Sequence, residues 1–287
     1  MPNTSGFRGH RLPGLDYLGI DRDIEFHLCG IKASEGLALH AQRNLSSIES
    51  HRTPIATTKS FQYRHSSMHH IPLCLIIFDF DGVIAESIAM KAEAFRETFS
   101  FVPEYQDEIV QYHLDNGGMS RFVKFRYIYK EMLHEELSPE REKWLGERYA
   151  GIVRRKMFSI PLVPGALELL ETVKGKIPLY IVSATPEEEM LEIADRRGLA
   201  GYFDGIYGSP GSKADCIREI LSKNGSSPEK TLFIGDAPQD YEAARDTGVR
   251  FIARVAPGDQ DRFSGKPGVE RIVSDLHEIR EVLLPIL

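Results

Sequence analysis

The sequence predicts an α/β protein in which an all-helical domain is inserted into a doubly wound, Rossmann-like parallel sheet. Three apolar runs, at 75–84, 178–185 and 232–240, are continuous rather than alternating, which is typical of strands buried on both faces of a parallel sheet. Helices and strands alternate over 161–287, as a doubly wound sheet requires. In contrast, 88–160 carries only helical periodicity and separates the first strand from the second.

The chain divides into three parts. Residues 1–70 form an N-terminal extension that holds seven of the ten histidines and shows no sustained periodicity in its second half. We interpret it as a disordered tail, or as a start site placed too far upstream with Met68 as the alternative start; a targeting or regulatory arm is the functional alternative. Residues 71–87 and 161–287 make up the α/β core, and residues 88–160 make up the helical insertion.

The insertion is expected to contain four amphipathic helices. Their periodicity favours segments at 88–100, 105–115, 119–135 and 139–158. The aromatic side chains of these segments are interpreted as the hydrophobic core of the insertion and not as a ligand cage.

Composition favours an enzyme in a reducing, cytoplasmic compartment. At 287 residues the chain can bury a sizeable core and hold two domains. No apolar run approaches the roughly 20 residues that a membrane-spanning helix needs. The net charge of −7 disfavours nucleic acid as a partner. Three widely spaced cysteines indicate neither a disulfide framework nor a zinc site.

The first apolar run delivers two carboxylates at its end. It reads Leu-Ile-Ile-Phe-Asp-Phe-Asp-Gly-Val-Ile, so Asp79 and Asp81 come where Gly82 breaks the strand. Open α/β sheets bind ligands at the carboxyl ends of their strands, and strand periodicity would point both aspartates to one side. Two such charges need a cation, a proton or a polar ligand nearby; the alternative is a strand that merely ends in a polar Asp-Gly turn.

A second apolar run ends in another acidic turn. Residues 232–240 read Leu-Phe-Ile-Gly-Asp-Ala-Pro-Gln-Asp, and Asp236 and Asp240 can face one way if a helix begins here. Asp236 alone is also compatible with a simple N-cap. Two acidic strand ends in one sheet indicate a site for a hard cation with oxygen ligands, which suits Mg²⁺.

Two further polar side chains complete the set. The run at 178–185 ends in the hydroxyl of Ser183, and the turn-rich segment 208–213 places Lys213 directly before a helical pattern. A hydroxyl and an ammonium group beside a Mg²⁺–carboxylate site are what a phosphoryl group needs. Taken singly, each is also explained as a strand-end cap or a surface lysine.

The ordered set resembles the four motifs of the haloacid dehalogenase-like (HAD) superfamily. Those motifs are a DxD strand end, a strand-end Ser or Thr, a Lys and a GDxxxD-type acidic turn. This sequence has them in that order as Asp79-Phe80-Asp81, Ser183, Lys213 and Gly235-Asp236-Ala237-Pro238-Gln239-Asp240. The resemblance covers residues from about 72 to 287 and implies a metal-dependent enzyme with a Rossmann-like core.

The resemblance also implies a role for each motif residue. Asp79 would be the nucleophile that forms an aspartyl-phosphate, and Asp81 would protonate the leaving oxygen and then deprotonate water. Mg²⁺ would be held by the Asp79 carboxylate, the Asp81 backbone carbonyl and Asp236, with Asp240 in support. Ser183 and Lys213 would bind the phosphoryl oxygens.

The helical insertion resembles the cap domain of the phosphoglycolate-phosphatase and β-phosphoglucomutase branch of that superfamily. In this branch the cap closes over the site, excludes water and selects the substrate. The segment Asn116-Gly-Gly-Met-Ser-Arg121 resembles a cap loop that faces the active site. The resemblance therefore makes Ser120 and Arg121 candidates for substrate binding, with the Arg121 guanidinium pairing with a substrate anion.

The main interpretation is a Mg²⁺-dependent phosphatase for a small phosphorylated metabolite. A phosphotransferase of the β-phosphoglucomutase kind is the alternative within enzymes, and no residue decides between the two. A phosphonate hydrolase would need a cap lysine that forms a Schiff base, and Lys91, Lys124 and Lys130 match no such context. The alternative from another class is a non-catalytic regulator that binds a phosphometabolite; a pure binder needs no carboxylate nucleophile.

Overall fold

A computed structural model describes residues 72–287 of the chain. The predictions made for 1–70, including the alternative start at Met68, lie outside the described residues. The boundaries expected between core and cap, at 87/88 and 160/161, remain a prediction.

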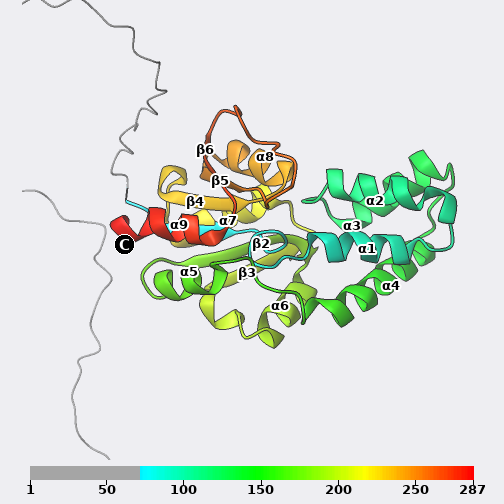
Figure 1. Cartoon of the computed structure of the whole chain (residues 1–287), viewed down its shortest axis with the longest axis horizontal. Helices are drawn as coiled ribbons and strands as arrows, with labels where there is room; N and C mark the ends of the chain where they lie inside the picture. The colour runs from blue at the N-terminus through cyan, green and yellow to red at the C-terminus, as the bar shows by residue number, and fades with distance from the viewer. Residues whose placement is uncertain (1–71) are drawn as a thin grey trace, which may run out of the picture. The chain divides into compact units, whose positions relative to one another are not determined.

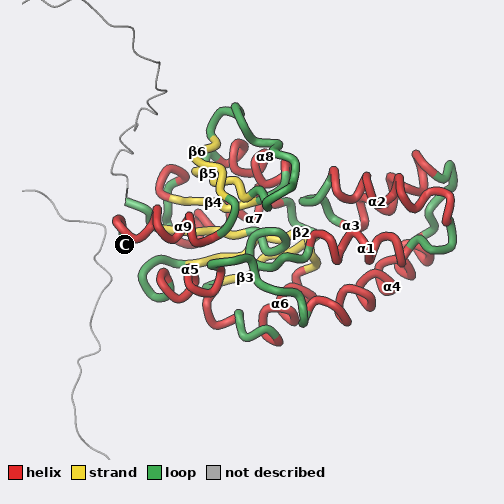
Figure 2. The backbone as a smooth tube through the Cα atoms, viewed as in Figure 1, coloured by secondary structure: helices red, strands yellow, loops and turns green. Residues whose placement is uncertain are grey.

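Six strands form one parallel sheet in the order β3-β2-β1-β4-β5-β6 (Figures 1 and 2). The strands are β1 (Leu75–Phe78), β2 (Leu179–Pro186), β3 (Gly205–Ser209), β4 (Thr231–Gly235), β5 (Arg250–Arg254) and β6 (Val269–Val273). The chain builds outward from β1 on one side and then returns to its other side with β4. The point where strand order reverses therefore lies at β1 and β4, where such sheets bind ligands beyond the carboxyl ends.

Helices cover both faces of this sheet, which confirms the predicted doubly wound class. Alternate residues of β1 belong to opposite faces: Ile76 packs in one hydrophobic cluster and Ile77 in the other. The first cluster includes residues of α5 (Ala166–Val173), α6 (Glu187–Arg196) and α9 (Leu276–Leu283). The second includes residues of α7 (Lys213–Asn224) and α8 (Pro238–Thr247). Burial on both faces explains the continuous apolar runs.

The insertion between β1 and β2 is helical throughout, as predicted (Figure 2). Its helices are α1 (Ile88–Thr98), α2 (Gln106–Asp115), α3 (Arg121–Tyr127), which continues into a π-helical turn (Ile128–Met132), and α4 (Pro139–Met157). The rings of Phe95, Phe125 and Tyr149 pack against one another in its centre. The aromatic residues thus form the core of the cap, and they hold α1, α3 and α4 together.

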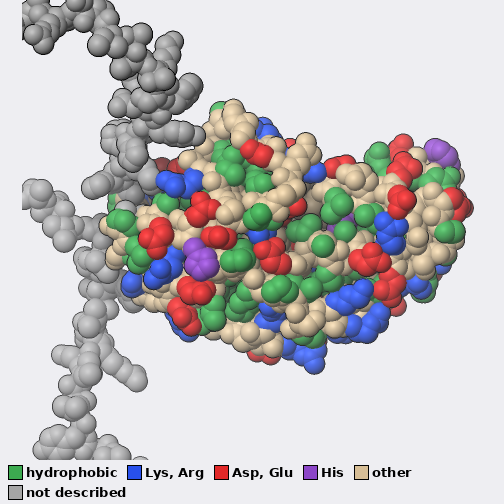
Figure 3. Space-filling view, viewed as in Figure 1, with side chains coloured by type: hydrophobic (Ala, Val, Ile, Leu, Met, Phe, Trp, Pro, Cys, Tyr) green, Lys and Arg blue, Asp and Glu red, His purple; other side chains and the backbone are tan. Residues whose placement is uncertain are grey.

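No helix among residues 72–287 is both long and apolar enough to cross a membrane. On the face drawn in Figure 3, acidic and basic side chains are interspersed over the described part of the chain. A cytoplasmic location stays a prediction.

Candidate active site

The first acidic motif lies in the loop directly after β1. Because β1 ends at Phe78, Asp79 and Asp81 are not strand residues, and strand periodicity does not govern their side chains. The backbone N–H of Asp79 still donates to the carbonyl of Ile234 in β4, at 2.9 Å. Gly82 then turns the chain with φ +72, a conformation that favours glycine. The two aspartates contact different partners: Asp79 contacts Lys213, and Asp81 contacts Lys91.

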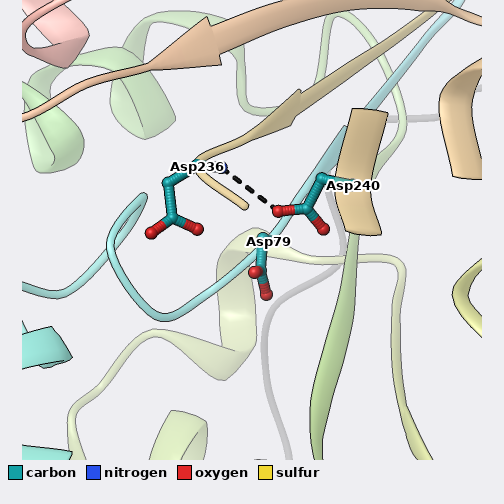
Figure 4. Close-up of side chains that lie close together, drawn as sticks. All are labelled: Asp79, Asp236 and Asp240. Atoms are coloured by element: carbon teal, nitrogen blue, oxygen red, sulfur yellow. Dashed lines mark hydrogen bonds between the residues drawn. The ribbon is translucent and has the colours of Figure 1, made fainter. Parts of the chain in front are cut away.

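Three carboxylates meet at the point where strand order reverses (Figure 4). Oxygens of Asp79, Asp236 and Asp240 all lie within 4.8 Å of one another. Asp79 follows β1, Asp236 follows β4, and Asp240 lies in the first turn of α8. The Asp240 carboxylate accepts hydrogen bonds from the backbone N–H groups of Asp236 at 3.2 Å and Ala237 at 3.0 Å, so it orients the loop that carries Asp236.

The carboxylates of this cluster outnumber the one ammonium group, that of Lys213, that pairs with them. Burial raises the pKa of Asp79 to about 7 against the opposing attraction of Lys213, and repulsion from Asp240 and Asp81 adds to the rise. Burial, followed by repulsion from Asp79 and Asp240, also raises the pKa of Asp236. An all-oxygen cluster that resists full ionisation in this way suits a hard divalent cation, whose charge would offset the repulsion.

Lys213 lies among these carboxylates. It is the first residue of α7, which Ser212 caps by accepting a hydrogen bond from the N–H of Asp215 at 3.1 Å. Its Nζ lies 2.8 Å from Asp79 Oδ2 and 2.5 Å from Asp240 Oδ1. Burial by itself lowers the pKa of Lys213, but the two carboxylates outweigh it and raise that pKa, so the side chain is an ammonium ion. Lys213 therefore places a positive charge beside the Asp79 carboxylate.

Asp81 belongs to a second set of contacts, with residues of α1 and β2. Its carboxylate oxygens lie 2.5 Å from Lys91 Nζ and 2.5 Å from Ser87 Oγ, and Thr185 Oγ1 lies 3.3 Å away. Burial opposes ionisation, but Lys91 and the Ser87 hydroxyl outweigh it and lower the pKa of Asp81. Ser183 is buried on β2, where its hydroxyl accepts a hydrogen bond from the N–H of Thr185 at 3.1 Å.

Lys91, Thr185 and Lys124 are site residues that the sequence analysis did not assign. Lys91 Nζ also lies 2.8 Å from Thr185 Oγ1, which ties the cap helix α1 to β2. The helical periodicity of the sequence could have indicated Lys91 and Lys124, because both lysines lie on the buried side of their helices. Lys91 shares a buried stripe of α1 with Phe95 and Thr98, and Lys124 shares one of α3 with Phe125. A lysine on an apolar stripe indicates a partner or a ligand inside.

The cap loop before α3 lies against the acidic turn of the core. A Cβ on Gly118 would come within 2.9 Å of Gln239 Cβ and 3.1 Å of Ala237 Cβ, so the close approach depends on a glycine here. Ser120 is the N-cap residue of α3, and its side chain accepts no capping hydrogen bond. It does not line the cavity described below.

Arg121 pairs with a core residue rather than standing free. Both terminal nitrogens of its guanidinium bind the carboxylate of Glu189 on α6, with 2.9 Å between Nη1 and Oε2. We expected the Arg121 guanidinium to pair with a substrate anion, but its two terminal nitrogens bind Glu189 instead. This ion pair links the cap to the core. Arg121 Nε is buried and has no hydrogen-bond partner among residues 72–287.

A cavity of about 50 Å³ separates the cap from the carboxyl ends of β1 and β2. Asp81 and Thr185 line it from the core side, and Lys91, Arg121 and Lys124 line it from the cap side. A small cavity lined by charged side chains therefore lies between cap and core beside Asp81.

The profile of the haloacid dehalogenase-like hydrolases matches residues 76–254, more than half of the chain. This chain belongs to that family. The match includes all four motifs, so the resemblance drawn from the sequence is confirmed at the level of the family.

Relatives of this haloacid dehalogenase-like hydrolase are named as phosphatases. A phosphoglycolate phosphatase of Aquifex aeolicus is 30% identical over 184 residues, which cover 61% of this chain and 82% of the relative. A phosphorylated carbohydrates phosphatase of Thermotoga maritima is 27% identical over 198 residues, covering 63% and 84%. A solved haloacid dehalogenase-like family hydrolase of Streptococcus pneumoniae aligns with TM-score 0.60 at 25% identity, over 74% of this chain and 98% of that one.

Proposed function

We propose that the chain is a Mg²⁺-dependent phosphatase that hydrolyses a small phosphorylated metabolite through an aspartyl-phosphate on Asp79. The observation that carries the proposal is the meeting of Asp79, Asp236 and Asp240 with the ammonium of Lys213 at the reversal point of the sheet. The phosphatase names of the relatives support the same reaction.

The reaction takes place in two displacements. In the first, an Asp79 oxygen attacks phosphorus, the bond to the leaving oxygen breaks, and Asp81 donates a proton to that oxygen. In the second, water attacks the phosphorus of the aspartyl-phosphate and Asp81 takes its proton, which releases phosphate and restores Asp79. Lys213 and Ser183 bind the phosphoryl oxygens, and the closed cap excludes bulk water.

The oxygen atoms of this acidic site fit Mg²⁺. Asp79 and Asp236 would hold it together with the backbone carbonyl of Asp81, while Asp240 supports Asp236 through the backbone amides. Bound there, the ion would neutralise negative charge that builds up on the phosphoryl oxygens.

The contacts of Asp81 bear on its two proton transfers. Lys91 favours the ionised carboxylate, which is the form that accepts a proton from water. A dianionic phosphate arriving beside Asp81 opposes that effect, since a nearby like charge raises a carboxyl pKa. The substrate itself therefore favours the protonated form that the first step requires.

The test is release of inorganic phosphate from a panel of small phosphate esters by the full chain with Mg²⁺. Turnover of at least one metabolite supports the proposal. A phosphate ester that is isomerised without release of phosphate would favour the mutase, and tight binding with no chemistry would favour the regulator.

Replacing Asp81 should slow both proton transfers without preventing attack by Asp79. Asp81→Asn should lower kcat by about 10²–10⁴-fold, the usual contribution of general acid–base catalysis. An activated aryl phosphate should lose less activity in the first step, because its leaving group needs no proton. Quenched-flow measurement with ³²P-labelled substrate should show a longer-lived phosphoenzyme, and an unchanged lifetime would contradict the assigned role.

Gly82 places the Asp81 loop against the metal-binding carboxylate. A Cβ there would collide with Asp236 Oδ2, so Gly82→Ala should displace that carboxylate and reduce phosphate release by about tenfold or more. Gly225→Ala is the matched control: Gly225 also has positive φ, at +58, but no atom in the described part of the chain lies within 4 Å of the added carbon. In both variants, backbone strain at the substituted position should lower the free energy of unfolding by about 1 kcal/mol. Equal activity in the two variants would contradict the explanation.

A further inference from the structure

Arg254 is a buried arginine at the carboxyl end of β5, and the mechanism proposed above does not use it. Only 3% of the residue is exposed. In the sheet, β4 separates β5 from β1. Even so, the guanidinium of Arg254 contacts the loop that follows β1, which we call the Asp81 loop (residues 81–86). This side chain therefore joins two parts of the sheet edge whose strands do not pair with each other.

The guanidinium binds the Asp81 loop at both of its ends. Its Nη1 donates to the carbonyl oxygen of Gly82 at 3.1 Å. Nη1 and Nη2 also bind the two carboxylate oxygens of Glu86, at 3.1 and 2.6 Å. The third nitrogen, Nε, donates to the carbonyl oxygen of Ser274 at 3.0 Å. Because the guanidinium is planar and rigid, these contacts fix both ends of the loop relative to the strands of the core.

The loop transmits this restraint to the Asp81 carboxylate. Ser87 comes directly after Glu86, and its hydroxyl donates to Asp81 Oδ1 at 2.5 Å. At the other end, the N–H of Gly82 donates to the carbonyl oxygen of Ala85 at 2.8 Å, which closes the loop on itself. The guanidinium thus holds the backbone directly after Asp81 and directly before the hydroxyl that binds Asp81.

Stability alone gives a weak reason for burying this arginine. Moving a guanidinium out of water costs free energy that its attraction to a carboxylate often does not repay, and apolar side chains of similar volume commonly stabilise a fold as well or better. A bidentate pair does fix geometry, because both groups are planar and their two hydrogen bonds are parallel. What the pair of Arg254 and Glu86 fixes is the position of the Asp81 loop.

We propose that Arg254 is a positioning residue for the proton transfers of Asp81: together with Glu86 it holds the Asp81 loop where the carboxylate reaches the leaving oxygen and the attacking water. This inference rests on the proposed phosphatase function. Proton transfer requires heavy atoms about 2.6–3.2 Å apart, so a small shift of the loop would slow it. Asp79 is held separately, through the hydrogen bond of its backbone N–H to Ile234, so attack on phosphorus depends less on Arg254.

The test measures phosphoenzyme formation by the full chain from two esters that differ in leaving group. In rapid-quench experiments at saturating Mg²⁺, Arg254→Met should slow formation from ethyl phosphate about tenfold more than formation from 4-nitrophenyl phosphate. The reason is that only the ethoxide leaving group needs a proton from Asp81. An equal effect on both esters would assign Arg254 to structure alone and overturn the proposal, and so would unchanged rates with both.

Arg250→Met is the matched control. Arg250 is the first residue of β5, at the opposite end of the strand from Arg254, and it makes the same kind of bidentate pair. Its Nε and Nη2 bind the carboxylate of Glu270 at 2.7 and 2.9 Å. Arg250→Met should therefore leave the ratio of the two rates at its wild-type value. The same change of ratio in both arginine variants would contradict a specific role for Arg254.

A second variant keeps the test open if Arg254→Met does not fold. Arg254→Lys keeps the positive charge, but an ammonium lacks the planar fork that binds a carboxylate at two points and a carbonyl oxygen at once. Its rate with ethyl phosphate should fall between those of the wild type and Arg254→Met, again with a smaller loss for 4-nitrophenyl phosphate. Full wild-type rates in Arg254→Lys would show that the fork does not position the loop.

Hydrogen exchange distinguishes failure of this inference from failure of the phosphatase function, because it requires no turnover. The N–H groups of Gly82, Ile84 and Ala85 all donate to carbonyl groups of this turn of the chain. They should exchange several-fold faster in Arg254→Met than in the wild type, and at the wild-type rate in Arg250→Met. Faster exchange without a wild-type phosphoenzyme from either ester rejects the phosphatase but retains the restraint on the loop. Unchanged exchange, with the wild-type phosphoenzyme present, rejects only the positioning role.

Discussion

Asp79→Asn should abolish phosphate release, with a loss on the order of 10³-fold or more, because the amide cannot form the phosphoenzyme. The fold should survive the change. Asparagine has nearly the same shape, and Lys213 keeps its contact with Asp240 at 2.5 Å. Burial raises the pKa of Asp79 to about 7, so its ionised form adds no stability that the amide would lose at neutral pH.

The measurement is acid-quenched labelling with a ³²P substrate, alongside steady-state phosphate release. The wild type should retain acid-stable label on protein, and Asp79→Asn should retain none. Asp246→Asn, at a half-exposed surface aspartate, should behave as the wild type. Substantial turnover by Asp79→Asn with a normal Tm would rule out the covalent mechanism.

Removal of divalent metal should also abolish turnover. Without the ion, Asp79, Asp236 and Asp240 repel one another, and the single ammonium group of Lys213 does not offset their charge together with that of the incoming phosphate. Phosphate release should therefore stop in EDTA and return when Mg²⁺ is added in excess. Magnesium-saturated EDTA is the control, and full activity in metal-free EDTA would exclude the proposed metal dependence.

Thermal stability gives a second readout that requires no substrate. A carboxylate must lose its proton to bind the ion, and the pKa of Asp79 is raised to about 7. The increase in Tm caused by Mg²⁺ should consequently be larger at about pH 8, above this pKa, than at about pH 5, below it. Asp236→Asn should remove most of that increase, and an increase that persists in this variant would place the ion elsewhere.

The fold and the acidic centre could be predicted from the sequence because both depend on local patterns. Burial on both faces requires the continuous apolar runs of β1 and β4, and parallel strands bring their carboxyl ends to one edge. Asp79 and Asp236 follow those strands directly, so the sheet alone brings them together. The length of β1 was less predictable: its apolar run continues past Phe78 into the loop, whose Phe80 and Val83 are also buried.

The sequence by itself determined the family, the sheet and the four motifs, since these follow from periodicity and short spacings along the chain. Only the tertiary structure decided which cations are already neutralised. Arg121 meets Glu189 and Lys91 meets Asp81 across the junction of cap and core, whereas Lys124 meets no carboxylate among the described residues. Charge balance in a buried site depends on distances of a few ångströms between elements far apart in the chain, and no pattern along a single helix encodes those distances.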